Sequence, residues 1–158
     1  MTRRYGRSRR GQRAYGEAPR NFGRNVTLLA GLTLHGIAAC LQVEMATTRE
    51  VFEAFVAQVL VPMLRPGQVV LLDNLSVHKR SRAQTMMEAV GARVFYLPRY
   101  SLELNPIEMA WSKVKSVLRG LEARTEAELD TAITQALASV TASNARGYFQ
   151  HAGYPLFN

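Results

Sequence analysis

Two acidic residues, Asp73 and Glu108, have the chemical type and the surroundings that metal-dependent phosphodiester chemistry requires. Asp73 directly follows the apolar run Val69–Leu72, and Glu108 is the third residue after Asn105, which with Pro106 makes a typical helix start. Two divalent cations about 3.5–4 Å apart can activate an attacking oxygen and stabilise a leaving one. Carboxylate oxygens are hard ligands that suit Mg²⁺. These side chains could therefore be metal ligands.

Each candidate residue also has a purely structural explanation. Asp73 and Asn74 are both favoured in turns that end strands. Glu108 lies where an acidic side chain often bonds back to the N-cap residue and interacts favourably with the helix dipole. His78, taken alone, is more often a surface or core histidine than a metal ligand. Local pattern by itself therefore favours structural roles.

The helix predicted from Asn105 carries polar and cationic residues on the same face as Glu108. Ser112, Lys115 and Arg119 follow Glu108 at i+4, i+7 and i+11. This face could offer a metal ligand and then phosphate-binding cations. The other face is apolar and should be buried; its residues are Ile107, Trp111, Val114, Leu118 and Leu121.

The segment that contains Asp73 has the order strand, helix, strand. The apolar run before Asp73 predicts a central strand covered on both faces. A helix is expected over residues 81–90, ending at Gly91, and a second strand over 93–97, which Pro98 closes. This order favours a parallel pair with a right-handed crossover. Asp73 would then lie at the carboxyl end of a strand, where open α/β sheets usually bind ligands.

Two further elements precede this segment. Residues 25–44 are rich in apolar and β-branched side chains and are interrupted at His35, which predicts a β-hairpin. Thr47 with Glu50 makes a capping-box pattern before a helix that should run to about Leu64. A last helical region is expected from Thr125, capped with Glu128; its apolar stripe comprises Leu129, Ile133, Leu137 and Val140.

Length and composition indicate one soluble α/β domain. The chain has 158 residues, of which 47% are hydrophobic, enough for one core but not comfortably for two. Polar residues such as Thr33 and His35 interrupt the longest apolar stretch, Val26–Leu41, so it lacks the ~20 apolar residues of a membrane helix. Cys40 alone forms no internal disulfide, and no secretory signal is evident. A cytoplasmic setting without membrane contact is expected.

The positive charge is concentrated in an N-terminal arm, residues 1–24. Eight arginines against Glu17 give this arm +7 of the total net charge of +8. Arginine suits bidentate phosphate contacts, and the interleaved Tyr5, Tyr15 and Phe22 could stack on bases. A solvated basic tail is an equally good explanation of the arm alone. The arginines are Arg3, Arg4, Arg7, Arg9, Arg10, Arg13, Arg20 and Arg24.

The combination of segments is more specific than any single residue. LLDNLSVHK and LPRYSLELNPIEMAWSKVK, which place Glu108 35 positions after Asp73, resemble the second-Asp and Glu segments of DDE transposases. The resemblance is to the bacterial insertion-sequence branch of the mariner-like superfamily. RRYGRSRRGQRAYG, NVTLLAGLTLHGI and the terminal FQHAGY also look like family segments in their usual order.

The resemblance implies a ribonuclease H-like catalytic domain over residues 25–158, with a mixed sheet flanked by helices, preceded by the basic arm. It implies two Mg²⁺ or Mn²⁺ ions as cofactors and transposon-end and target DNA as partners. Asp73 corresponds to the second catalytic carboxylate, which would bridge both ions, and Glu108 to the third. Asn74, His78 and Asn105 would be their neighbours. The residues expected to contact DNA are Arg3, Arg4, Arg7, Arg9, Arg10, Arg13, Lys79, Lys115 and Arg119.

The first Asp of the family pattern has no counterpart in the chain. The resemblance places it on the first strand, shortly before RRYGR, and the only other Asp is Asp130, which follows Glu108. Loss of that strand should leave unpaired sheet edges. Arg99 and Leu102 also depart from the pattern, because they stand where the family more usually has prolines.

The leading hypothesis is therefore the catalytic domain of an insertion-sequence transposase, which cleaves and transfers DNA strands near the bacterial nucleoid. The chain would be truncated or the downstream part of a split gene, inactive alone and completed by the upstream part or another transposase subunit. The alternative is a non-catalytic DNA-binding remnant that regulates intact transposase. A third hypothesis, an unrelated metal nuclease, requires Glu17 or Glu44 as its third carboxylate.

Overall fold

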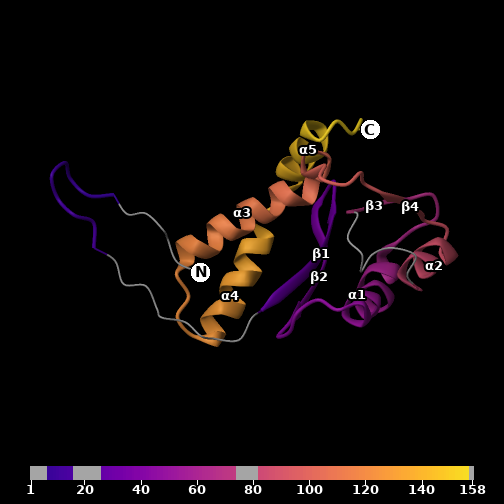
Figure 1. The fold of residues 1–158 in the computed structure, drawn as a ribbon, viewed down its shortest axis with the longest axis horizontal. Helices are drawn as coiled ribbons and strands as arrows, with labels where there is room; N and C mark the ends of the chain where they lie inside the picture. The colour runs from indigo at the N-terminus through magenta and orange to yellow at the C-terminus, as the bar shows by residue number, and fades with distance from the viewer. Residues whose placement is uncertain (1–6, 16–25, 74–81, 157–158) are drawn as a thin grey trace.

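The computed structural model describes residues 7–15, 26–73 and 82–156 and has a mixed α/β fold (Figure 1). Its strands are β1 (Thr27–Thr33), β2 (Gly36–Val43), β3 (Val69–Leu72) and β4 (Arg93–Tyr96). Its α-helices are α1 (Arg49–Phe55), α2 (Arg82–Ala89), α3 (Pro106–Leu121), α4 (Glu126–Ala138) and α5 (Ala142–His151). Among these described helices, none is both long and apolar enough to cross a membrane.

Strands β1 and β2 form the predicted antiparallel hairpin, with one irregularity. The register passes from Gly31 opposite Ala39 to Leu32 opposite Ile37, so Ala38 is an extra residue on β2. Such a β-bulge shifts the alternation of side chains along its strand. Ile37 and Ala39, two positions apart, consequently pack against different hydrophobic clusters.

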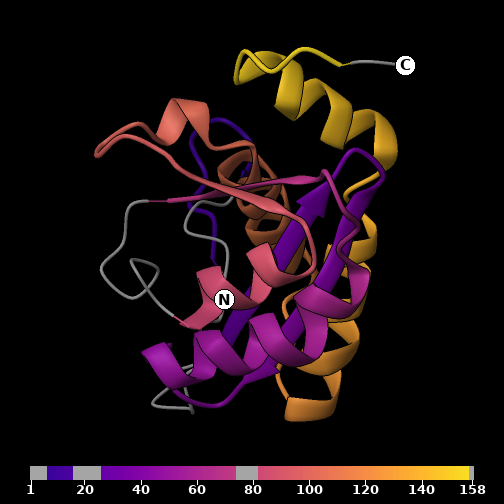
Figure 2. The same cartoon turned by 90° about the vertical axis from the view of Figure 1, so that its right-hand side faces the viewer.

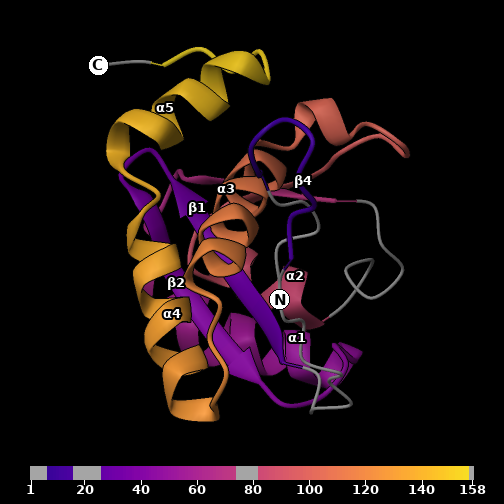
Figure 3. The same cartoon turned by 90° about the vertical axis from the view of Figure 1, so that its left-hand side faces the viewer.

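The hairpin lies between two groups of helices, and each of its faces packs on a separate hydrophobic cluster. Figure 1 shows α3 and α4 on one side of the strands and α1 and α2 on the other, and Figure 3 shows the α3–α4 side from the front. Leu28 packs with α3 and α4, whereas Leu29 packs with α1 and α2. Neighbouring strand residues point to opposite faces, so the hairpin is the middle layer.

Strands β3 and β4 form a separate parallel pair, as the strand–helix–strand order predicts. Val69 pairs with Arg93, and the register continues to Leu72 opposite Tyr96. The prediction of one mixed sheet is wrong for the described residues, which form two two-stranded sheets, β1–β2 and β3–β4. Val69 is 54% exposed, so β3 is also not the fully covered central strand that its apolar sequence predicted.

The first helical segment differs from the sequence prediction at its cap and in its helix type. Thr48, not Thr47, caps α1: its hydroxyl accepts a hydrogen bond from the Val51 N–H at 3.4 Å. The helical segment as a whole ends at Met63, close to the predicted end at about Leu64. Only its first part is the α-helix α1; a π-helical turn, η1 (Val56–Leu60), and a 3₁₀ turn, η2 (Val61–Met63), follow it. Pro62 explains the change, because proline lacks an N–H and clashes with the preceding helical turn.

The predicted last helical region is two helices. Helix α4 begins at the expected capping box, in which Thr125 and Glu128 bond to each other's backbone N–H groups. Helix α4 ends at Ala138. Thr141 then caps α5 by accepting a hydrogen bond from the Asn144 N–H at 3.3 Å. The amide of Asn144 takes the place that glutamate or glutamine usually fills in this motif.

Candidate active site

Asp73 directly follows the carboxyl end of strand β3. The N–H of Leu97 donates a hydrogen bond to the Leu72 carbonyl at 2.8 Å, so pairing continues to the residue just before Asp73. The side chain of Asp73 is half-buried. Parallel strands place their carboxyl ends at a common edge, and ligands of open α/β folds bind there. The position of Asp73 matches the one expected from sequence.

Five predicted site residues lie outside the described residues: Asn74, His78, Lys79, Arg3 and Arg4.

Glu108 is the third residue of α3, and its carboxylate is exposed. Glu128 has the same position in α4, where its carboxylate accepts hydrogen bonds from the N–H groups of Arg124 at 2.7 Å and Thr125 at 3.0 Å. In the described part of the chain, Glu108 makes no corresponding bond to its N-cap residue. The local sequence pattern favoured a helix-capping role for Glu108, and the described part of the structure shows no such capping bond.

The backbone at Asn105 explains the difference between the two helix starts. The residues that cap α1, α4 and α5 have ψ angles of 173°, 164° and 166°, whereas Asn105 has a ψ of 97°. An N-cap side chain reaches the third helical N–H from the extended conformation that the first three share. Asn105 instead has only 9% exposure and makes no side-chain cap bond. Pro106 and Ala110, in the first turns of α3, are also buried.

The polar face of α3 is oriented as predicted. Ser112, Lys115 and Arg119 are exposed, as is Glu108 on the same face. The predicted apolar stripe is confirmed at Val114 and Leu118, which are buried. Ile107 and Trp111 are only half-buried and Leu121 is 42% exposed, whereas Pro106 and Ala110 are buried without having been predicted.

The described residues contain no group of three His, Cys, Asp or Glu side chains placed to hold a metal ion. Neither Asp73 nor Glu108 is therefore part of a three-ligand group among the described residues. Glu44, one candidate for that role, is exposed beyond the end of β2 and belongs to no such group. Glu17, the other candidate, lies outside the described residues.

The described part of the basic arm, residues 7–15, forms a loop that stands away from the helices in Figure 1. A turn closes it: the Gln12 N–H donates to the Arg9 carbonyl at 3.0 Å, and Gly11 has a positive φ of 85°. Tyr15 is 90% exposed. All four arginines of this loop are exposed, as phosphate contact would require; they are Arg7, Arg9, Arg10 and Arg13.

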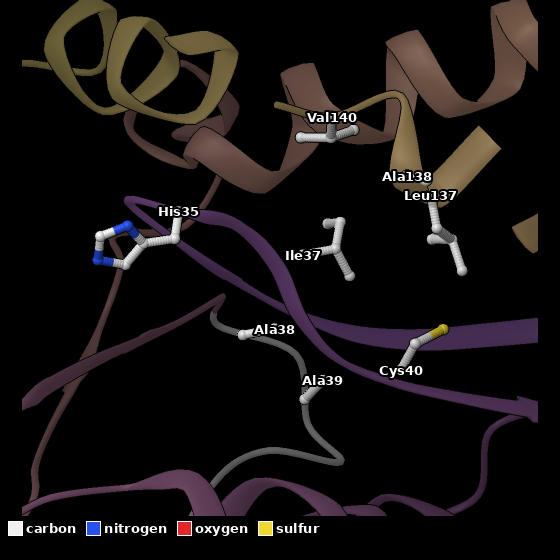
Figure 4. A pocket seen from close by; sticks show the side chains of 8 residues that line it. All are labelled: His35, Ile37, Ala38, Ala39, Cys40, Leu137, Ala138 and Val140. Atoms are coloured by element: carbon white, nitrogen blue, oxygen red, sulfur yellow. The ribbon is translucent and has the colours of Figure 1, made fainter. Parts of the chain in front are cut away.

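A shallow cavity of about 400 Å³ lies between β2 and the end of α4, and neither candidate carboxylate lines it (Figure 4). The imidazole of His35 points away from the Cys40 sulfur, so the two do not form a nucleophile–base pair. Burial raises the pKa of the Cys40 thiol, which lowers its reactivity. This cavity therefore offers no chemistry that competes with Asp73 and Glu108.

Comparison with protein families shows which kind of protein this chain is. The family model of the DDE superfamily endonucleases matches residues 1–130. The chain belongs to this family. The matched residues include the arm, Asp73 and Glu108, and they end within α4. No curated protein matches the chain.

Membership of this family indicates the general class of activity. DDE superfamily endonucleases are transposase-like nucleases that act on DNA and typically use divalent metal ions. The resemblance in LLDNLSVHK and NPIEMAWSKVK is thus confirmed at the level of the family. An unrelated nuclease, the third hypothesis from sequence, is excluded by this match.

One feature next to Glu108 had no clear signal in the sequence. The hydroxyl of Tyr154 donates a hydrogen bond to the Leu104 carbonyl at 2.8 Å, which ties the C-terminal segment to the loop before α3. The ring of Tyr154 also packs edge-on against Phe149. A contact across 50 residues has no local periodicity, and the one sequence signal was that Phe149 and Tyr154 belong to the FQHAGY segment.

Proposed function

We propose that the chain is the catalytic domain of an insertion-sequence transposase, in which Asp73 and Glu108 are metal ligands for DNA strand cleavage and transfer. The main observation behind the proposal is the environment of the Glu108 carboxylate. Glu108 has the position of a capping glutamate, yet its carboxylate is exposed and makes no capping hydrogen bond to the described residues. The family match over both carboxylates supports the same roles.

The donor set fits hard divalent cations. Asp73 and Glu108 present carboxylate oxygens, which Mg²⁺ and Mn²⁺ prefer. Bound ions would activate the attacking oxygen and stabilise the leaving oxygen of the phosphodiester. Asp73 and Glu108 would hold these ions. A third carboxylate has to come from outside the described residues, because no third ligand gathers there.

The remaining residues would bind and orient DNA. Lys115 and Arg119 continue the polar face of α3 beyond Glu108 and would contact backbone phosphates. The exposed arginines of residues 7–15 would add contacts that do not depend on base sequence. In the proposed reaction, water first attacks the phosphodiester at the transposon end. The released 3′ hydroxyl then attacks a phosphodiester of target DNA, forms a new phosphodiester with it and displaces a 3′ hydroxyl of the target strand.

The two small sheets suggest how the missing carboxylate is supplied. Within the described residues, β1 pairs only with β2 and β3 pairs only with β4, so each sheet has a strand edge without a partner strand. Unpaired edges are templates for strand addition. We propose that an Asp-bearing strand, from an upstream transposase segment or another subunit, pairs there and completes the site.

Complementation tests this function. The 158-residue chain would be joined to an upstream segment that carries an Asp-bearing strand, and Mg²⁺-dependent nicking of end-labelled transposon-end DNA would be measured. Asp73→Asn and Glu108→Gln should each reduce nicking to background, while Glu128→Gln, a matched helix-start control, should leave it intact. Undiminished nicking by Asp73→Asn would contradict the proposal.

A second candidate function is favoured by the absence of a three-ligand group among the described residues together with the exposed arginines of residues 7–15. In this case the chain is a non-catalytic DNA-binding regulator of intact transposase. It would bind DNA equally well after Asp73→Asn or Glu108→Gln, and the joined protein would show no nicking under any divalent metal.

A further inference from the structure

The loop between β4 and α3, residues 97–105, displays an aromatic side chain that the fold does not use. Tyr100 is 97% exposed, and no described residue forms a hydrogen bond or ring contact with it. Leu102, two positions on, is 67% exposed. Figures 2 and 3 show this loop, in salmon, projecting from the body of the molecule.

The backbone at Tyr100 is also strained. Its φ is +63°, in the left-handed region that glycine and asparagine enter more readily than tyrosine. The only other described residue besides glycine with a positive φ is Glu122, which ends α3. Strained positions persist where the surrounding structure imposes them, and they are concentrated at binding and catalytic sites.

Both ends of the loop are fixed, so the ring stands on a rigid base. On one side, Leu97 is only 7% exposed and its N–H bonds to Leu72, just before Asp73. On the other, the 3₁₀ turn η4 (Leu102–Leu104) leads into α3, and the Tyr154 hydroxyl holds the Leu104 carbonyl at 2.8 Å. The loop therefore runs from β4, which pairs with the strand before Asp73, to α3, which carries Glu108.

The charges of the loop favour a base over a phosphate as its ligand. Arg99 is exposed beside Tyr100, but Glu103, four positions after Arg99, is exposed as well, so the two charges of the loop cancel. A phosphate would gain little net attraction from this loop. An aromatic ring stacks on any nucleobase, provided that the base is unpaired and its face is accessible.

We propose that Tyr100 is a positioning residue that stacks on an unpaired base of the DNA strand end held at the Asp73–Glu108 site. This inference rests on the proposed function, because it assumes DNA as the ligand. The rigid loop presents the ring eight positions before Glu108 in the chain. Stacking there would hold a frayed strand end against the start of α3.

The test uses the full chain and duplex DNA with a short unpaired 3′ overhang that contains 2-aminopurine, whose fluorescence stacking quenches. Tyr100→Asn removes the ring but accepts the left-handed backbone. It should weaken overhang binding about 10-fold and abolish quenching, without lowering the thermal unfolding midpoint. Tyr100→Phe should restore both binding and quenching. Leu102→Ala, which removes exposed apolar surface from the same loop, should change neither.

The outcomes separate this inference from the proposed function. Wild-type quenching and binding that survive Tyr100→Asn would overturn the stacking role while leaving the nuclease proposal intact. Absence of any DNA binding by the wild-type chain would overturn both. Loss of stacking in Tyr100→Asn, combined with no nicking by the joined protein, would retain Tyr100 as a DNA contact and remove the catalytic proposal.

Discussion

At the scale of single residues, the contrast between Glu108 and Glu128 is the most informative feature of the protein. The two glutamates have the same position in their helices, but only Glu128 bonds to the backbone before its helix. Those bonds stabilise the ionised carboxylate and hold the pKa of Glu128 below its ordinary value of 4.5. A helix-start glutamate is thus structural in one case and available for chemistry in the other.

The lowered pKa of Glu128 predicts a pH-dependent contribution to stability. Because the folded pKa lies below 4.5, the capping bonds stabilise the fold fully above pH 4.5, and their contribution is lost as pH falls through the folded pKa. Glu128→Gln should therefore lower the thermal midpoint at pH 7, and the gap from wild type should narrow below pH 4.5. Differential scanning calorimetry measures this gap. A gap that stays constant with pH would contradict the role of the charge.

At the scale of elements, the β1–β2 turn is fixed by its contact with the α4–α5 junction. Gly36 has a φ of +119°, and a Cβ atom built there would lie 2.6 Å from the Val140 carbonyl oxygen. Only glycine meets both conditions, since side chains disfavour this φ and the carbonyl leaves no room. The close approach of Gly36 to the Val140 carbonyl therefore fixes the position of the hairpin against the α4–α5 junction.

This contact predicts a large effect of a small substitution. Gly36→Ala should destabilise the fold by about 2 kcal/mol or more, through backbone strain and the clash with Val140. Gly147→Ala is the matched control: Gly147 lies in α5 with open space around its Cα, so alanine should stabilise by about 0.5–1 kcal/mol. Urea unfolding of the three proteins measures both changes. Equal stability of Gly36→Ala and wild type would disprove the locking contact.

At the scale of the whole molecule, charge and fold are separated. Residues 1–24 hold nearly all of the excess positive charge, and the described part of this arm stands apart from the helices (Figure 1). The remaining residues carry a net charge of only +1. Electrostatic attraction to DNA should therefore originate in the arm, while the carboxylates and Tyr100 belong to the folded body.

The salt dependence of DNA binding tests this separation. Replacing the four exposed arm arginines by glutamine should reduce the slope of log affinity against log salt concentration by about 0.9 for each lost phosphate contact. The four are Arg7, Arg9, Arg10 and Arg13. Fluorescence anisotropy over a salt series measures the slope.

A control variant removes the same charge from exposed positions of the folded body. Its substitutions to glutamine are at Arg49, Arg65, Arg93 and Arg146. It should change the slope much less than the arm variant. Equal slopes for the two variants would show that overall charge, not the arm, governs binding.

The sequence by itself determined most local structure, because local structure depends on interactions between near neighbours. Apolar and β-branched residues interrupted at His35 specified the hairpin, and the apolar run before Asp73 specified β3. Thr125 and Glu128 specified the start of α4 through their own hydrogen bonds. The two candidate carboxylates were also found from sequence, since their neighbouring segments are distinctive.

Only the tertiary structure decided how those elements are used. The bulge at Ala38 reverses the packing face of β2, and Thr48 replaces Thr47 as the cap of α1. The long predicted helix is divided where Thr141 caps α5, and the side chain of Asn144, the capping partner of Thr141, also accepts a hydrogen bond from Lys113 of α3 at 2.6 Å. The exposed, uncapped state of Glu108 depends on the loop backbone before it. These features depend on contacts between distant residues, which no local sequence pattern encodes.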